Sequence, residues 1–209
     1  MKTDSIEQMI AERFALSSGR QLRELIAVIA ENRGQVADPA TLDAGVAFIR
    51  SYIQQVPYMI KVGWTAACTV GLEKEMQGIL EAAISYWEQD IDIIPDHIGV
   101  IGLMDDAYCS MTSLQAVSDH FQLQTGKLLF PTDLSSANRL MRELIGDPYG
   151  SELDQLVLKS LADACVMDAV KAMASQEKQL NFENQGTIWH HDAAEIMDTT
   201  VASKLGIDA

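Results

Sequence analysis

The amino-acid sequence predicts an all-α protein, a multi-helix bundle of about eight or nine helices that forms a single helical domain over residues 1–209. Apolar side chains recur at spacings of three and four along most of the chain, as they do on one face of a helix. No stretch alternates with period two, and no turn dipeptide joins two β-rich runs. An apolar share of 48% in 209 residues is enough for a sizeable core.

The first three helices have recognisable boundaries. Apolar faces at residues 6–14 and 22–29 predict two helices, and Gly34 supplies the left-handed conformation that ends the second. The third begins at Asp38, a natural N-cap, with Pro39 at its first helical position. Its apolar seam runs to Val56, and Pro57 predicts the next boundary.

The same spacing predicts further helices over residues 58–70, 72–87, 108–121, 134–144, 151–165 and 187–201. Asp133 can cap the helix over 134–144, and Gly146 closes it. Residues 90–105 interrupt the helical rhythm, with Pro95, Gly99 and Gly102 as punctuation. This interruption therefore predicts a corner between two helices.

Charge and cysteine content exclude several classes of function. Fifteen basic and thirty acidic side chains give a formal net charge of −15, which disfavours nucleic acid and docking on anionic lipid. The three cysteines form no CxxC pair, which indicates reduced thiols and a cytoplasmic protein. The first ten residues contain no apolar signal-peptide region, and the longest apolar stretch is too short to span a membrane.

Acidic residues gather in one part of the chain. Residues 75–126 hold nine carboxylates and no Lys or Arg, whereas an ordinary helix surface interleaves both signs. The nine are Glu75, Glu81, Glu88, Asp90, Asp92, Asp96, Asp105, Asp106 and Asp119. Two interpretations remain open: a solvated acidic surface with Asp caps, or carboxylates that converge on a cation or a basic protein partner.

Two short motifs lie within the acidic region, Asp92-x-Ile-Pro-Asp96 and Gly102-x-x-Asp105-Asp106. With this spacing, the chain resembles the YkvA-like family, also called domain of unknown function 1232, with a looser similarity over about residues 79–121. The resemblance implies a helical segment found in bacterial proteins, some of them membrane-associated. It implies no known reaction.

The motif residues have a structural interpretation. Asp96 lies in the first turn of a short helix, where the helix dipole favours a negative charge. Gly99 and Gly102 permit a sharp bend or a close backbone approach. Asp105 can then cap the next helix, with Asp106 in its first turn. These carboxylates would satisfy amide groups at a helical corner.

The same residues also have a functional interpretation, as a metal site. The four candidate ligands are Asp92, Asp96, Asp105 and Asp106. Carboxylate oxygens suit Mg²⁺, Ca²⁺ or Mn²⁺ rather than a thiolate-binding metal. A bound divalent cation would activate water, with His97 or His120 as a candidate base.

A second group of candidate ligands lies near the C-terminal end. His191, Glu195 and Asp198 share one face of the expected helix over 187–201, a pattern that can supply ligands to Zn²⁺ or Fe. The group is not HExxH, and the apolar stripe of this helix lies elsewhere, which favours a solvated face. GxSxG, GxGxxG and P-loop motifs are absent from the sequence.

These observations lead to one main hypothesis and two alternatives. The main one is a non-enzymatic interaction or scaffold protein that binds a protein partner through the acidic face around the motif or through an exposed apolar helix face. The first alternative is a divalent-metal-dependent hydrolase with a carboxylate site around Asp96, Asp105 and Asp106, acting on a phosphorylated or lipid-like small molecule. The second is peripheral membrane association, which only the family resemblance suggests and the net charge does not support.

Overall fold

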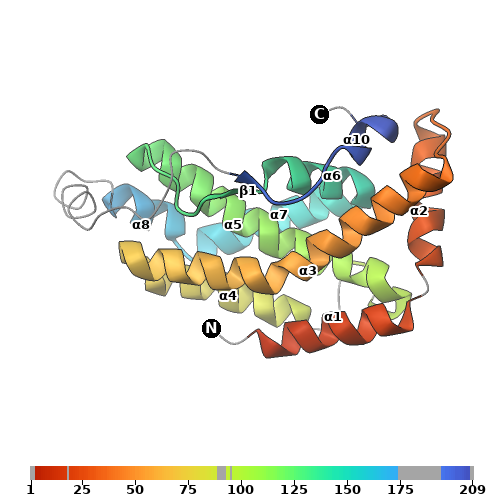
Figure 1. Ribbon diagram of the computed structural model, residues 1–209. Coiled ribbons are helices and arrows are strands. Elements are labelled where there is room, and N and C mark those ends of the chain that lie inside the picture. Colours follow the sequence, from red (N-terminus) through yellow and green to blue (C-terminus); the bar gives the residue numbers. More distant parts are fainter. Residues whose placement is uncertain (1–2, 18, 89–92, 95, 174–193, 208–209) are drawn as a thin grey trace.

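A computed structural model describes residues 3–17, 19–88, 93–94, 96–173 and 194–207, with the backbone alone at residues 96–98, 173, 194 and 195. Helices dominate it, which confirms the predicted all-α bundle (Figure 1). The helices are α1 (Asp4–Leu16), α2 (Arg20–Asn32), α3 (Pro39–Val70), α4 (Glu73–Trp87), the 3-10 helix η1 (Asp96–Leu103), α5 (Met104–Thr125), α6 (Ser135–Ile145), α7 (Tyr149–Asp163), α8 (Val166–Met173) and α10 (Val201–Lys204). Two-residue strands, β1 (Thr132–Asp133) and β2 (Ala194–Glu195), pair in parallel.

Helix α5 forms the centre of the bundle. It contacts α3, α4, α6, α7 and α8, while α3 spans the length of the molecule with α1 and α4 packed against it (Figure 1). Fourteen residues of α5, between 104 and 121, are buried. They include Ser, Gln and Asp as well as apolar side chains, so polar groups enter the core along this helix. None of the helices in the described ranges is both long enough and apolar enough to cross a membrane.

Several predicted helix boundaries are confirmed. The carboxylate of Asp38 accepts a hydrogen bond from the Thr41 backbone N–H at 2.7 Å, and Pro39 is the first residue of α3. The predicted start of α6 is also confirmed, although Leu134 and not Asp133 holds the N-cap position; Asp133 accepts a hydrogen bond from the Ser135 N–H at 2.8 Å. Gly146 ends α6 with φ +74° and ψ 171°, an extended conformation of positive φ that glycine adopts readily.

The boundary predicted at Pro57 is wrong, because α3 continues through it to Val70. A proline inside a helix loses one backbone hydrogen bond and costs about 3 kcal/mol. Here the proline ring is itself buried, and Ile53, Val56 and Ile60 around it are fully buried. Packing on both sides of the proline offsets the local cost, and Gly71 ends the helix instead.

The C-terminal helices also differ from the prediction. The helix expected over 151–165 begins at Tyr149 and ends at Asp163, and Cys165 adopts a positive φ of +54° before α8. Of the helix expected over 187–201, residues 187–193 lie outside the described residues, and residues 194–200 are not helical. Asp198 accepts hydrogen bonds from both the backbone N–H and the hydroxyl of Thr200, and this local turn competes with the helix.

The corner predicted before α5 is present. Within η1, Gly99 has φ +79° and ψ −131°, a combination that side-chain-bearing residues avoid. The chain therefore changes direction here between α4 and α5, and η1 packs against α1 and α2. This corner places Asp105 and Asp106 in the first turn of the central helix.

Candidate functional site

The two carboxylates at the start of α5 are buried rather than exposed. Asp105 is 0% exposed and Asp106 is 1% exposed. One carboxylate oxygen of Asp105 accepts hydrogen bonds from the Ile94 backbone N–H at 3.0 Å and from the Tyr86 hydroxyl at 3.1 Å. Asp105 thus joins α5 to the end of α4 and to the segment before η1.

This arrangement corrects the prediction that Asp105 caps α5. The N-cap position belongs to Leu103, which makes no side-chain capping bond. Asp105 lies inside the first turn, and its side chain turns to donors from an earlier part of the chain. The spacing of the motif indicates a helix start correctly, but it does not distinguish a local cap from a contact between segments.

A second contact lies one turn further along α5. The indole N–H of Trp87, at the end of α4, donates to the Ser110 hydroxyl at 3.1 Å, and both residues are buried. A buried indole N–H requires such a partner. Together with the bond between Tyr86 and Asp105, this contact fixes the end of α4 against the first two turns of α5.

Burial and the carboxylates alter the acidity of neighbouring groups. Burial, followed by the charge of Asp105, raises the pKa of the Tyr86 hydroxyl well above its ordinary value. Burial also raises the pKa of the Cys109 thiol, and the charges of Asp105, Asp106 and Asp154 raise it further. Both groups are therefore neutral at physiological pH, and Cys109 is a poor nucleophile.

The predicted metal ligands are only partly described. Asp92 lies outside the described residues, and Asp96 is described by its backbone alone, at the start of η1. Asp105 and Asp106 are adjacent and buried. Across the described part of the chain, no group of three or more His, Cys, Asp or Glu side chains is placed to hold a metal ion. A metal site that also includes Asp92 and Asp96 stays a prediction.

The histidine predictions are also only partly described. The side chain of His97, and the whole of His191, lie outside the described residues. His120 is half-buried, and its Nε2 lies 3.1 Å from the Met167 carbonyl oxygen, a contact that joins α5 to α8. Asp198 is exposed and takes part in the turn with Thr200.

A cavity of about 350 Å³ lies between α4, α5 and α7, and is called the α4–α7 cavity below. Its apolar wall includes Ile79, Leu156 and Val157. Hydroxyl groups and the Cys109 thiol complete the lining, and none of its ten lining residues is charged. The sequence gives no signal of this cavity, because it forms between three helices whose lining residues are distant along the chain.

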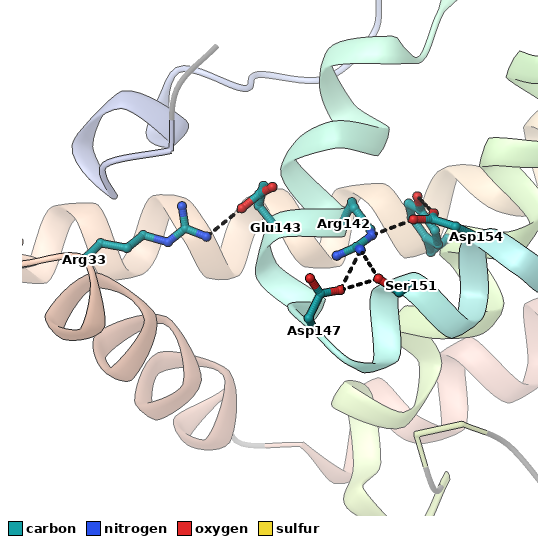
Figure 2. A network of polar contacts seen from close by, with 7 residues as sticks. Arg33, Arg142, Glu143, Asp147, Ser151 and Asp154 are labelled. Atoms are coloured by element: carbon teal, nitrogen blue, oxygen red, sulfur yellow. Dashed lines mark hydrogen bonds and ion pairs between the residues drawn. The ribbon is translucent and has the colours of Figure 1, made fainter.

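A polar network that the sequence does not predict joins α5, α6 and α7 (Figure 2). The Tyr108 hydroxyl donates to Asp154 at 2.6 Å, and Arg142 donates to the other oxygen of that carboxylate at 2.9 Å. Arg142 also binds Asp147 at 2.7 Å and the Ser151 hydroxyl at 3.1 Å. Tyr108 comes from α5, Arg142 from α6, and Ser151 and Asp154 from α7, while Asp147 lies in the turn between α6 and α7. Their irregular spacing gives no signal of the network in the sequence.

These features define a helical bundle whose α4–η1–α5 corner is fastened by a buried carboxylate. Residues 80–110 match the model of a family described as "Protein of unknown function (DUF1232)". The matched segment covers the end of α4, η1 and the first turns of α5, so it includes both Tyr86 and Asp105. No curated protein and no solved structure matches the chain.

Proposed function

We propose that this protein is a non-enzymatic interaction protein that binds a basic protein partner through one face of α4. The supporting observation is a row of exposed carboxylates, Glu73 and Glu81 on that helix and Glu88 at its C-cap, which we call the α4 acidic stripe. Their spacings of eight and seven place them on one side of the helix. The exposed polar side chains of Gln77 and Ser85 lie between them.

The charge pattern around the stripe supports a basic partner. Lys74, next to Glu73, is the one basic residue of α4, and no Lys or Arg follows it until residue 127, so the stripe keeps a net negative charge. A row of like charges repels itself and creates a negative potential that attracts a complementary surface. Asp105 and Asp106, by contrast, are buried and cannot take part in such a surface.

A lysine-rich peptide provides a direct test of the stripe. Its affinity is measured by calorimetry at low and moderate salt, in wild type and in the triple variant Glu73→Gln/Glu81→Gln/Glu88→Gln. The control triple variant removes the same charge from other exposed carboxylates, at Glu12, Glu31 and Glu152. We expect the stripe variant to lose about tenfold in affinity and the control about twofold or less. Equal losses would reduce the effect to net charge and contradict the proposal.

The hydrolase alternative is a second candidate, favoured by the complete burial of two adjacent carboxylates. Burial of a charged carboxylate is costly unless hydrogen bonds, an opposite charge or a metal ion compensates it. Asp105 and Asp106 would serve as ligands together with Asp96, and Mg²⁺, Ca²⁺ or Mn²⁺ would activate water for hydrolysis.

Thermal unfolding with each cation tests this candidate in wild type and in Asp105→Asn/Asp106→Asn. An ion that binds only the folded state stabilises it by about 2.7 kcal/mol at a hundredfold excess over its dissociation constant. A rise in unfolding temperature that the double variant abolishes would support the metal site. Equal responses in both proteins would rule out these two ligands.

A further inference from the structure

We propose that the α4–α7 cavity binds a small amphipathic amine, with an apolar body inside the cavity and a cationic head near the start of α5. None of the three glutamates of the α4 acidic stripe lines this site, which does not depend on a basic protein partner. Three properties of the cavity carry the inference: its shape and apolar wall, its neutral polar groups, and the negative charge behind one side of it.

The shape of the cavity suits a small ligand. Its volume of about 350 Å³ lies within the range of ordinary ligand pockets. The α4 side is lined by small residues, Ala82 and Ala83, which leave room between the helices. Ile79, Leu156 and Val157 supply apolar surface on both α4 and α7, which would cover a hydrocarbon or aromatic body.

Neutral polar groups provide contacts for one polar end of the ligand. The Tyr86, Ser113 and Ser160 hydroxyls come from α4, α5 and α7 respectively, so they surround the cavity from three sides. The Tyr86 hydroxyl already donates to Asp105 and accepts from the Ile93 N–H, so the Ser113 and Ser160 hydroxyl oxygens would accept the hydrogen bonds of an ammonium group. Cys109 adds a thiol, whose raised pKa keeps it uncharged.

The charge behind the cavity selects the sign of the ligand. Asp105 and Asp106 lie one turn before Cys109 on α5, and Tyr86 links the cavity wall directly to the Asp105 carboxylate. Both buried carboxylates lie within about one helical turn of Cys109, which lines the cavity. Charges act over a longer range in a protein interior than in water, so this end of the cavity favours a cation and disfavours an anion.

Three probes of nearly equal size isolate the effect of charge: phenethylamine, 2-phenylethanol and phenylacetate. Each is titrated into the full-length protein near neutral pH, with binding followed by calorimetry and by the shift in unfolding temperature. We expect phenethylamine to bind about tenfold more tightly than the neutral alcohol, and phenylacetate to bind more weakly than either. Equal affinities for the amine and the alcohol would overturn the charge assignment, and no binding at millimolar concentrations would overturn the site.

A cavity-filling variant locates the binding. Ala82→Leu places a larger side chain at the mouth of the cavity, whereas Gln77→Leu adds the same side chain at an exposed position of α4 that does not line it. Both positions are exposed, so neither change disturbs the core. We expect Ala82→Leu to weaken phenethylamine binding about tenfold or more and Gln77→Leu to leave it unchanged. Similar affinities in both variants would place the amine elsewhere and overturn the proposal.

Cys109 supplies an independent measure of occupancy. With the exposed cysteines replaced in Cys68→Ser/Cys165→Ser, the remaining thiol lines the cavity and is modified by a small thiosulfonate reagent. Bound phenethylamine should slow this modification several-fold, with a concentration dependence that matches its calorimetric affinity. An unchanged rate at saturating amine would contradict binding in the cavity, and it would leave the proposal for the α4 acidic stripe unaffected.

Discussion

Replacement of Asp105 by Ala tests whether the α4–η1–α5 corner depends on a buried carboxylate. The substitution removes the acceptor for the buried Ile94 N–H and for the half-buried Tyr86 hydroxyl. A buried donor left without an acceptor costs about 1–3 kcal/mol. The Tyr86 hydroxyl can turn toward water, so only the net value of its hydrogen bond is lost, about 0.5–1.5 kcal/mol. We therefore expect a loss of about 3 kcal/mol in the free energy of unfolding.

Urea denaturation followed by far-ultraviolet circular dichroism measures this loss. With a slope of about 2–3 kcal/mol per molar urea, a loss of 3 kcal/mol lowers the unfolding midpoint by about 1–1.5 M. Asp163→Ala is the matched control, because this aspartate is the exposed last residue of α7. Its loss should stay within about 0.5 kcal/mol. A double-mutant cycle with Tyr86→Phe should give a coupling energy above about 0.5 kcal/mol.

Two outcomes would refute the structural role of Asp105. A loss below about 1 kcal/mol for Asp105→Ala would show that the Ile94 N–H finds another partner at no cost. A large loss that disappears when divalent cations are chelated would show that the carboxylate acts through a bound metal. The isosteric Asp105→Asn variant keeps an acceptor oxygen, so the hydrogen-bond interpretation predicts a smaller loss than in the alanine variant.

Three further predictions concern packing, pH and thiol reactivity. Gly63→Ala should destabilise the protein by about 1–3 kcal/mol, because the added Cβ would lie 2.5 Å from a methyl group of Leu114. Urea denaturation measures this loss. Combination with Leu114→Val, which shortens the clashing side chain, should recover part of it. The hydrogen bond from the Thr41 N–H lowers the pKa of Asp38 in the folded protein. The carboxylate therefore contributes its full stabilisation above pH 3.8, and this contribution is lost as the pH falls through the lower, folded-state pKa. Between pH 6 and pH 3, the unfolding midpoint of Asp38→Asn should fall less steeply than that of the wild type. In timed alkylation at pH 8, followed by mass spectrometry, the exposed Cys68 and Cys165 should react quickly. Cys109 should react slowly, because burial keeps its thiol protonated. Three equally fast thiols would contradict the buried position of Cys109.

Helix starts and bends could be predicted from the sequence where the interactions that set them involve neighbouring residues. A capping carboxylate, a proline at a first helical position and a glycine with positive φ each act within a few residues. The starts of α3 and α6 and the bend at Gly99 were predictable for that reason. The continuity of α3 through Pro57 was not, because the packing that compensates for the proline comes from side chains distant in sequence.

The candidate site was less predictable, because α5 is a central helix that carries polar side chains. The apolar spacing of Tyr108, Met111, Leu114, Val117 and Phe121 indicates one buried face, which leaves the start of the helix to be interpreted as solvated. In the structure, the buried region extends to Asp105, Asp106 and Ser110 as well.

A polar side chain in the core requires a partner, and for α5 the partners come from neighbouring helices. Tyr86 and Trp87 reach it from α4, and Asp154 reaches it from α7. Each pair joins residues between 19 and 46 positions apart, a separation at which a single sequence shows no periodic signal. The motif in the matched segment is therefore best understood as one half of a set of contacts whose other half lies on α4, and the small side chains between those contacts leave the α4–α7 cavity open. Removal of the contacts should accordingly disturb the cavity together with the corner, whereas removal of the exposed α4 carboxylates should disturb neither.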